Sequence, residues 1–156
     1  MVIIGIDPGF SGAIAIWRPA IRSLYVYDMP TLPNAKGKTE LDLHTLHDLL
    51  TPEDDTRHIA VVEQVAAMRG QGVSSMFRFG QGYGAIQMAL ASHKIETHYV
   101  TPAKWKAHFG LSSDKGVSRG LAMRRVPDAA EQFKRVKDDG RAEATLLAIY
   151  GEEKVG

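Results

Sequence analysis

The sequence predicts an α/β fold in which a mixed five-stranded sheet carries helices on both faces. The main observation is the order of the elements: three strands come first, and strands then alternate with helices. Consecutive strands give antiparallel pairs, whereas strand–helix–strand connections give parallel pairs. The chain has 156 residues, of which 44% are hydrophobic. This is enough for one core, so we expect a single domain over residues 1–156.

The first strand is the short apolar run from Val2 to Ile6, which is typical of a strand buried on both faces. It ends on Asp7. Pro8 and Gly9 predict a turn there, because Pro fixes φ and Gly tolerates positive φ. The apolar run 13–17 follows as the second strand of a hairpin. An isolated Asp-Pro-Gly usually only starts a turn, so a role for Asp7 depends on the other acids of the chain.

Residues 23–28 alternate between apolar and polar types and include aromatics, which predicts a third strand. The segment from Met29 to Thr39 contains two prolines and the lysines Lys36 and Lys38. We predict a loop here. A solvated connection is favoured over a basic finger that contacts a partner.

Leucines that recur near a period of 3.6 predict an amphipathic helix over 40–50, with Thr39 as its N-cap. Residues 58–63 are a second buried strand that ends in a carboxylate, Glu63. A long helix from Ser74 to about His93 follows.

The long helix carries an apolar stripe. It also contains two glycines, Gly80 and Gly84, which are four residues and thus about one helical turn apart. Each glycine inside a helix costs about 1 kcal/mol relative to alanine. Such a cost suggests close backbone approach, either to the sheet or to a second copy of the chain. The stripe is therefore a candidate core face and a candidate subunit contact. It consists of Phe79, Tyr83, Ile86 and Leu90.

The C-terminal part alternates one more strand with helices. Residues 95–100 predict the strand, and Thr101-Pro102 opens a helix that runs to about Phe109. A further helix begins near Ser112 and is closed by Pro127. A helical turn over 128–136 leads to a last helix that starts at Asp139. A meander followed by crossovers is the outline of the ribonuclease H fold.

The formal net charge is only +1, so the overall charge does not indicate a polyanionic partner. The distribution is more informative, because the segment 94–141 holds eleven basic residues against six acidic ones. The chain has no cysteine, which excludes disulfides, thiolate zinc sites and cysteine nucleophiles. No stretch is long enough to span a membrane, and Asp7 interrupts the region where a signal peptide needs its apolar core. We therefore expect a cytoplasmic protein without membrane association.

Two pairs of acids form the candidate catalytic set. Asp7 and Glu63 each end a buried strand, so they meet at one rim of the sheet if those strands are neighbours. Asp139 and Glu143 are spaced i, i+4 and share one face of the last helix. Four adjacent carboxylates need cations to stay ionised, and oxygen ligands select Mg²⁺ or Mn²⁺. Two such ions about 3.5–4 Å apart promote phosphodiester hydrolysis.

The alternative is structural. Asp138 and Asp139 then only cap the last helix, and Glu143 pairs with Arg141 or Lys137 at the surface.

Five motifs in this order resemble the RuvC family of Holliday junction resolvases, particularly its shorter phage-type members, over nearly the whole chain. They are Ile4-Gly-Ile-Asp7-Pro-Gly9, Val61-Val-Glu63-Gln-Val65, Phe77-Arg-Phe-Gly-Gln-Gly-Tyr-Gly84, Thr101-Pro-Ala-Lys-Trp-Lys106 and Asp139-Gly-Arg-Ala-Glu143-Ala. The resemblance implies a homodimeric endonuclease that cuts four-way DNA junctions by paired nicks. It implies two Mg²⁺ ions per active site, with Mn²⁺ as a substitute, and a bacterial or phage-infected host cytosol.

The resemblance places catalytic and metal-binding roles on Asp7, Glu63, Asp139 and Glu143. By position it also places DNA contacts on Lys106 and Lys115. Lys104 and Arg119 cluster with these lysines around two helix starts, where phosphate is favoured.

The chain departs from the family pattern at two places. The bacterial enzymes end with two aspartates three apart, whereas here Glu143 is preceded by Asp139 or Asp138, and the i, i+4 spacing favours Asp139. An aromatic that stacks on a junction base is replaced by Ala66, with Met68 or Arg69 as candidate substitutes, and Arg69 also as a DNA contact.

Three other functions fit parts of the pattern. One is a ribonuclease H-like nuclease that acts on RNA–DNA hybrids or on other branched DNA. Another is an ATP-binding relative, but that class usually has two duplicated domains and this chain has the length of one. The third is a non-catalytic junction-binding module, which would gain nothing from acids placed where phosphates must approach.

Overall fold

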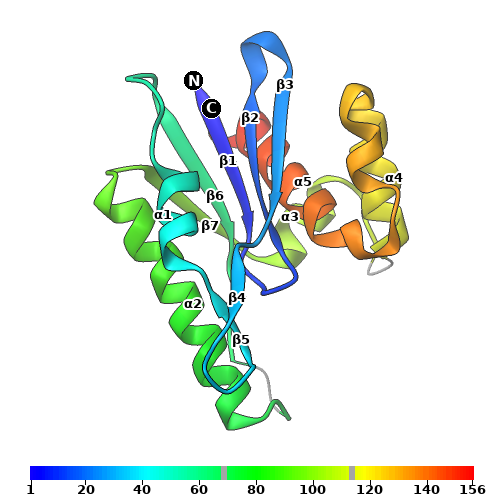
Figure 1. Ribbon diagram of the computed structural model, residues 1–156. Coiled ribbons are helices and arrows are strands. Elements are labelled where there is room, and N and C mark those ends of the chain that lie inside the picture. The colour runs from blue at the N-terminus through cyan, green and yellow to red at the C-terminus, as the bar shows by residue number, and fades with distance from the viewer. Residues whose placement is uncertain (68–69, 113–114) are drawn as a thin grey trace.

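The structure is a computed structural model that describes residues 1–67, 70–112 and 115–156, without the side chain of Lys115. Its centre is a five-stranded sheet in the order β3-β2-β1-β6-β7 (Figure 1). The strands β1 (Val2–Asp7), β2 (Ala13–Arg18) and β3 (Ser23–Asp28) are antiparallel neighbours. The strands β6 (His58–Glu63) and β7 (Glu96–Val100) run parallel to β1. The predicted mixed sheet is confirmed.

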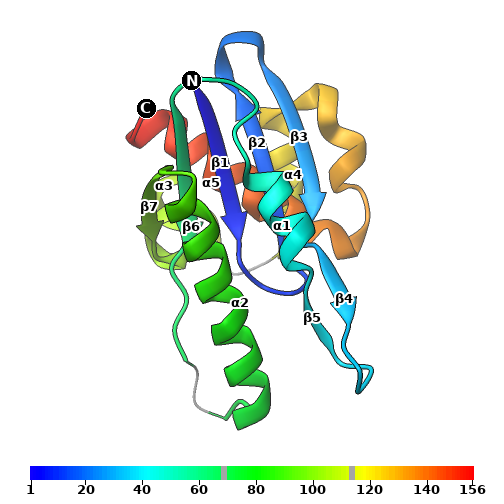
Figure 2. The same cartoon turned by 60° about the vertical axis from the view of Figure 1, so that its left-hand side comes forward.

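Helices cover both faces of the sheet, as predicted (Figures 1 and 2). The helices α1 (Leu43–Leu50) and α2 (Val73–Ser92) lie on one face. On the other face lie α3 (Pro102–His108), α4 (Lys115–Arg125) and the long α5 (Asp139–Lys154). Short 3₁₀ turns connect the elements: η1 (Pro19–Ile21), η2 (Pro127–Phe133) and η3 (Val136–Asp138). In the described part of the chain, no helix is long and apolar enough to cross a membrane.

The first strand shows how the sequence divides the core between the two faces. Its side chains alternate, so Ile4 and Ile6 pack against α1 and α2, whereas Ile3 packs on the α5 side. Gly5 also lies on the α5 side. A Cβ added at Gly5 would lie only 2.0 Å from the backbone oxygen of Ala144, so the absence of a side chain lets α5 approach β1 closely.

This close approach predicts a large loss of stability for Gly5→Ala. The new Cβ would meet the backbone oxygen of Ala144 and the backbone nitrogen of Ala148, and neither atom can rotate away as a side chain could. We therefore expect the free energy of unfolding to fall by about 3 kcal/mol or more. Gly120→Ala in α4 is the matched control, because a Cβ there makes only an ordinary contact, 3.6 Å from Nη1 of Arg124, and alanine favours a helix by about 1 kcal/mol. Urea denaturation measures the free energy of unfolding of both variants. Equal midpoints for Gly5→Ala and the wild type would contradict the packing of α5.

The segment predicted as a loop is instead a hairpin of β4 (Thr31–Pro33) and β5 (Thr39–Leu41), so that prediction was wrong. Its turn is built locally: the side-chain oxygen of Asn34 accepts hydrogen bonds from the backbone N–H groups of Lys36 and Lys38. Thr39 is therefore paired in a strand and is not the predicted N-cap. Helix α1 starts at Leu43, and the side chain of Asp42 caps it by accepting from Thr45 N at 3.2 Å.

The predicted stripe on α2 faces the core, with Phe79 half-buried and Tyr83 packed against the core cluster. Ile86 and Leu90 are buried in the core of the single chain. Gly80 and Gly84 are exposed, and a Cβ at either position would meet nothing within 4 Å. The glycine that permits close packing is Gly82, which is buried. A subunit contact on α2 therefore has to use side chains other than Ile86 and Leu90.

Candidate active site

Asp7 and Glu63 end neighbouring parallel strands, β1 and β6, in which Ile6 lies opposite Val62. Because both strands point the same way, both carboxylates lie at one rim of the sheet, as the sequence predicted.

The start of α5 lies against the turn that follows Asp7. A Cβ at Gly140 would lie 2.5 Å from the backbone oxygen of Ser11, so only glycine permits this approach. Asp139 begins the helix, and Glu143 follows one turn later. Glu143 repels both Asp7 and Glu63 electrostatically, so these three carboxylates converge at the rim.

The convergence changes the acidity of the strand carboxylates. The pKa of Asp7 rises from its ordinary value of 3.8 to about 7, mainly through burial and then through repulsion by Glu143 and Glu63. The Gly9 N–H, 3.4 Å from Oδ1, and the charge of Lys106 lower the pKa in part. Burial also raises the pKa of Glu63, although Trp105 Nε1 donates to Glu63 Oε2 at 2.8 Å and lowers it.

Two of the residues predicted to contact DNA pair with these acids. Lys106 Nζ lies 2.9 Å from Glu143 Oε1, and Arg119 Nε donates to Asp139 Oδ1 at 2.8 Å. All four side chains are at most one-quarter exposed. Glu143 therefore pairs with neither Arg141 nor Lys137, the two partners of the structural alternative.

The other predicted DNA contacts are placed in different ways. Lys104 lies in the exposed first turn of α3, and no carboxylate pairs with it in the described part of the chain. Lys115 begins α4, but its side chain lies outside the described part. Arg69 and Met68 lie wholly outside the described residues.

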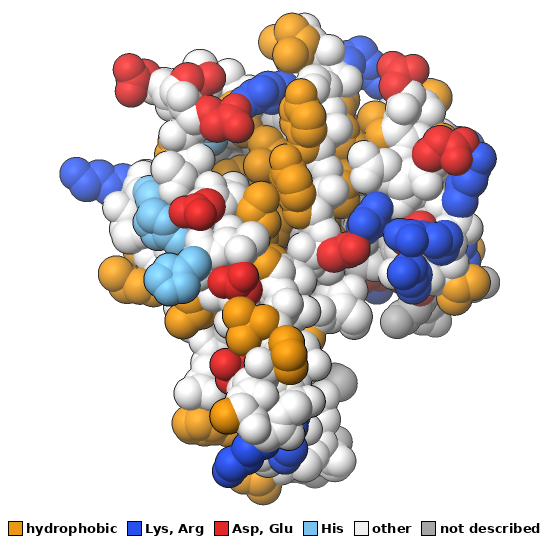
Figure 3. Space-filling view, viewed as in Figure 1, with side chains coloured by type: hydrophobic (Ala, Val, Ile, Leu, Met, Phe, Trp, Pro, Cys, Tyr) orange, Lys and Arg blue, Asp and Glu red, His pale blue; other side chains and the backbone are white. Residues whose placement is uncertain are grey.

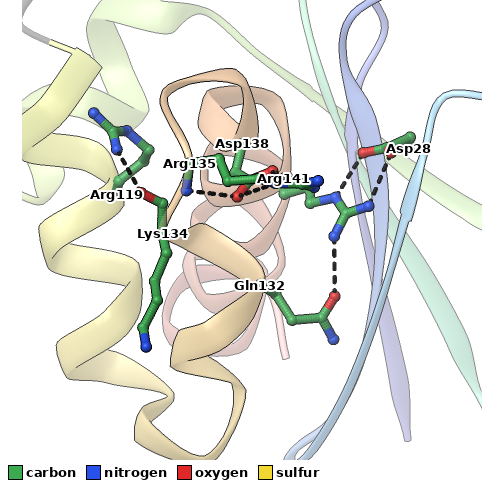
Figure 4. Close-up of polar contacts among 7 residues, drawn as sticks. All are labelled: Asp28, Arg119, Gln132, Lys134, Arg135, Asp138 and Arg141. Carbon is green, nitrogen blue, oxygen red and sulfur yellow. Dashed lines mark hydrogen bonds and ion pairs between the residues drawn. The ribbon is translucent and has the colours of Figure 1, made fainter.

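Asp138, the alternative to Asp139, is already engaged. It is buried, and its carboxylate accepts from the backbone N of Arg135 at 2.8 Å and from the guanidinium of Arg135 at 2.8–3.2 Å (Figure 4). The hydrogen bonds from Arg135 hold the pKa of Asp138 below its ordinary value. Asp138 thus fixes the chain that enters α5, and Asp139 is the more available candidate ligand.

Three polar residues around the site were given no role there from the sequence: Asp28, Arg141 and Trp105. Asp28 ends β3 at the same rim as Asp7, and Arg141 from α5 binds it through two bonds of 2.6 and 2.8 Å (Figure 4). This fork ties the first turn of α5 to the sheet and lowers the pKa of Asp28. Trp105, which orients Glu63, was quoted within a motif but given no role. Asp28 carried the same signal as Asp7, an acid at the end of a strand.

The donor set fits a hard divalent cation, because its acids offer only oxygen ligands and repel one another. As placed, however, no group of three or more His, Asp or Glu side chains within the described residues lies close enough to hold one metal ion. The ion pairs explain this: Glu143 is turned toward Lys106, and Asp139 toward Arg119. Mg²⁺ or Mn²⁺ would compete with these two cations for the carboxylates.

Neither a known family model nor a curated protein matches the sequence. Solved structures do. RuvC of T. thermophilus in complex with a Holliday junction substrate superposes with a TM-score of 0.61 at 16% identity, over 100% of this chain and 98% of that chain. The chain has the fold of the RuvC Holliday junction resolvases.

Two further structures agree. A second structure of Thermus thermophilus RuvC gives a TM-score of 0.58 at 15% identity, over 98% of this chain and 96% of that chain. The structure of the fowlpox virus Holliday junction resolvase gives a TM-score of 0.51 at 15% identity, over 98% of this chain and 99% of that chain. The ribonuclease H-like fold predicted from the order of strands and helices is therefore confirmed.

Proposed function

We propose that the protein is a divalent-metal-dependent endonuclease that resolves four-way DNA junctions by paired nicks. The observation that carries the proposal is the convergence of Asp7, Glu63 and Glu143 at one rim, where the pKa of Asp7 rises to about 7. A structural role would not require acids that repel one another. The RuvC-like fold supports a junction as the substrate.

The residues take the following roles in the proposal. Asp7 and Glu63, on rigid strand ends, would hold the metal ions together with Glu143 and Asp139 from α5. Bound there, two such ions would supply activation of the attacking water and charge stabilisation of the leaving oxygen. Trp105 fixes the orientation of Glu63 by its hydrogen bond.

Lys106 and Arg119 supply positive charge next to the acids, where the scissile phosphate would enter. Lys104, at the exposed start of α3, extends this basic surface. Lys115 and Arg69 are proposed to contact the junction, and Arg69 is a candidate substitute for the aromatic that Ala66 replaces. Figure 3 shows Lys and Arg side chains gathered over α4 and the start of α5.

Paired nicks need two active sites, so we propose a twofold homodimer. The exposed face of α2 is the candidate contact. Val73, Phe77 and Met88 are 86%, 66% and 66% exposed, and they follow one another at helical spacing. Gly80 and Gly84 lie between them with open space around them, which would let a second helix approach closely.

One experiment tests the function. Labelled four-way junction, linear duplex and RNA–DNA hybrid are incubated with the protein, with Mg²⁺, with Mn²⁺ or with a chelator. We expect metal-dependent cleavage of the junction alone, at two symmetric positions. Cleavage of the hybrid would favour the ribonuclease alternative, and binding without cleavage would favour a non-catalytic module.

The pair between Lys106 and Glu143 predicts two effects of Lys106→Met. The salt slope of junction binding should fall by about 0.9, because one phosphate contact is lost. The Mg²⁺ concentration that gives half of the thermal stabilisation should also fall, because Lys106 no longer competes for Glu143. Lys104→Met is the control, since Lys104 pairs with none of the four candidate acids among the described residues, and only its salt slope should change. A Lys106→Met protein with an unchanged Mg²⁺ response would exclude this competition.

A further inference from the structure

The hairpin of β4 and β5 projects from the rim that carries Asp7, beside the N-terminal half of α2 (Figures 1 and 2). It is rooted in the turn after Asp7, because Met29 N donates to Gly12 O at 2.9 Å. The base of the hairpin is closed by a second hydrogen bond, which Asp42 N donates to Pro30 O at 3.0 Å. The position of the hairpin is therefore linked to the position of the candidate active site.

Packing against α2 holds the hairpin in place. Leu41 is buried, and it lies against Gly82, where a Cβ would be 3.3 Å from Leu41 and 3.4 Å from Phe10 of the Asp7 turn. Arg78 of α2 donates from Nη1 to the backbone oxygen of Thr39 at 3.1 Å. The hairpin is thus a supported arm.

The tip of the hairpin presents two free lysines. Asn34 Oδ1 accepts from Lys36 N at 2.9 Å and from Lys38 N at 3.0 Å, and Gly37 supplies the left-handed residue with a φ of 69°. Both lysine side chains are exposed, and neither has a carboxylate partner in the described part of the chain. Figure 3 shows basic side chains at the far end of this projection.

The charge of the arm selects its partner. Over residues 31–41 and 73–92 the charged side chains are Lys36, Lys38, Arg78 and Glu40, and Arg78 is occupied by the hairpin backbone. A cationic tip without a neutralising acid is suited to a polyanion. Four residues from Pro30 to Asn34, where the turn begins, reach roughly 13 Å beyond the rim at about 3.3 Å each. At about 3.4 Å per phosphate along one strand, this distance corresponds to about four base pairs of duplex.

We propose that the β4–β5 hairpin is a second DNA-contacting element, in which Lys36 and Lys38 bind backbone phosphates of a duplex arm away from the cleaved position. The proposal rests on the proposed junction-cleaving function. It contradicts our expectation of a solvated connection in this segment and assigns a partner to the basic finger.

The double variant Lys36→Gln/Lys38→Gln tests the contact. Junction affinity is measured across a salt series, and we expect the log–log slope to fall by about 1.8 for each engaged hairpin, about 0.9 per lost phosphate contact. Lys94→Gln/Lys154→Gln removes the same charge at the opposite end of the sheet, where Lys94 precedes β7 and Lys154 ends α5. That control should keep the wild-type slope. Equal slopes for the wild type and the hairpin variant would overturn the proposal.

A second measurement locates the contact on DNA. Phosphates roughly two to six base pairs from the crossover, which bracket the estimated reach, are replaced by uncharged methylphosphonates. The wild type should lose affinity for the substituted junction, whereas the hairpin variant should lose no more, because the lysines and phosphates act as one pair. If the losses of affinity from the lysine substitutions and from the phosphate replacement add up, the lysines do not contact these phosphates, and the proposal is overturned. If the wild type binds junction and linear duplex equally, the proposed function fails, while the slope comparison on duplex still decides the role of the hairpin.

Discussion

Replacing Asp7 by asparagine is expected to slow junction cleavage by more than about a hundredfold, since outer-shell partners of metal ligands already contribute about 10- to 100-fold and a ligand itself contributes more. Asparagine keeps the shape of the side chain and forms turns well, so a mere turn residue would tolerate the change. Binding of junction DNA should be as tight as in the wild type or tighter, because one negative charge near the phosphates is gone. Gel-shift and cleavage assays on the same junction separate the two effects.

The same substitution should change how stability depends on pH without metal. Burial and neighbouring acids raise the pKa of Asp7 to about 7 in the folded protein, against 3.8 ordinarily. Between these values the folded state holds a proton that the unfolded state has released. The contribution of Asp7 to the free energy of unfolding is therefore fully present below about pH 4. It falls by about 2–4 kcal/mol as the pH rises to about 7. Asp7→Asn should remove this decline and melt at an equal or higher temperature than the wild type at pH 8.

The effect of Mg²⁺ on the melting temperature is a second test of Asp7. It should raise the melting temperature of the wild type, because only the folded state gathers the carboxylates, and it should raise that of Asp7→Asn less. Asp55→Asn, an exposed acid in the loop before β6, is the matched control and should behave as the wild type. Cleavage by Asp7→Asn at a rate near that of the wild type would leave Asp7 as a turn residue.

The parts of the fold that the sequence predicted are those encoded by short-range patterns. The strands that end on Asp7 and Glu63 are apolar runs rich in β-branched residues, which the sequence identifies directly. That the two strands are neighbours was a condition of the prediction, and the structure meets it. The i, i+4 spacing of Asp139 and Glu143 needs no tertiary information. Together with neighbouring strands and a last helix that packs at the rim, these signals predicted that the acids lie together.

The parts that failed depend on which surface of an element meets which neighbour. Helix α2 is apolar on two faces, so its sequence left open whether the stripe with Ile86 faces the core or a second copy of the chain, and the structure places it in the core. The hairpin was missed because its strands have only three residues each. The pairs of Lys106 with Glu143 and of Arg119 with Asp139 join residues from different helices, and no local pattern predicts them.

Replacing Phe77 by glutamate is expected to convert a dimer into a monomer without unfolding the chain. The side chain is 66% exposed, so the single chain loses little packing. In a twofold contact each substitution counts twice. Losing two buried phenylalanines costs about 3–6 kcal/mol, which is a factor of about 10² to 10⁴ in the dissociation constant. Gly84→Leu should act similarly by keeping the two helices apart, since open space surrounds Gly84 in the single chain.

Sedimentation measures the assembly, and a supercoiled plasmid with an extruded cruciform measures the consequence. Paired nicks by a dimer linearise this plasmid, whereas a monomer can leave only a nicked circle. Leu43→Glu is the control, because Leu43 is 58% exposed on α1, outside the α2 face. It should remain dimeric and linearise the plasmid. A wild type that sediments as a monomer at micromolar concentration would refute the dimer, and a dimeric Phe77→Glu would move the contact away from this face of α2.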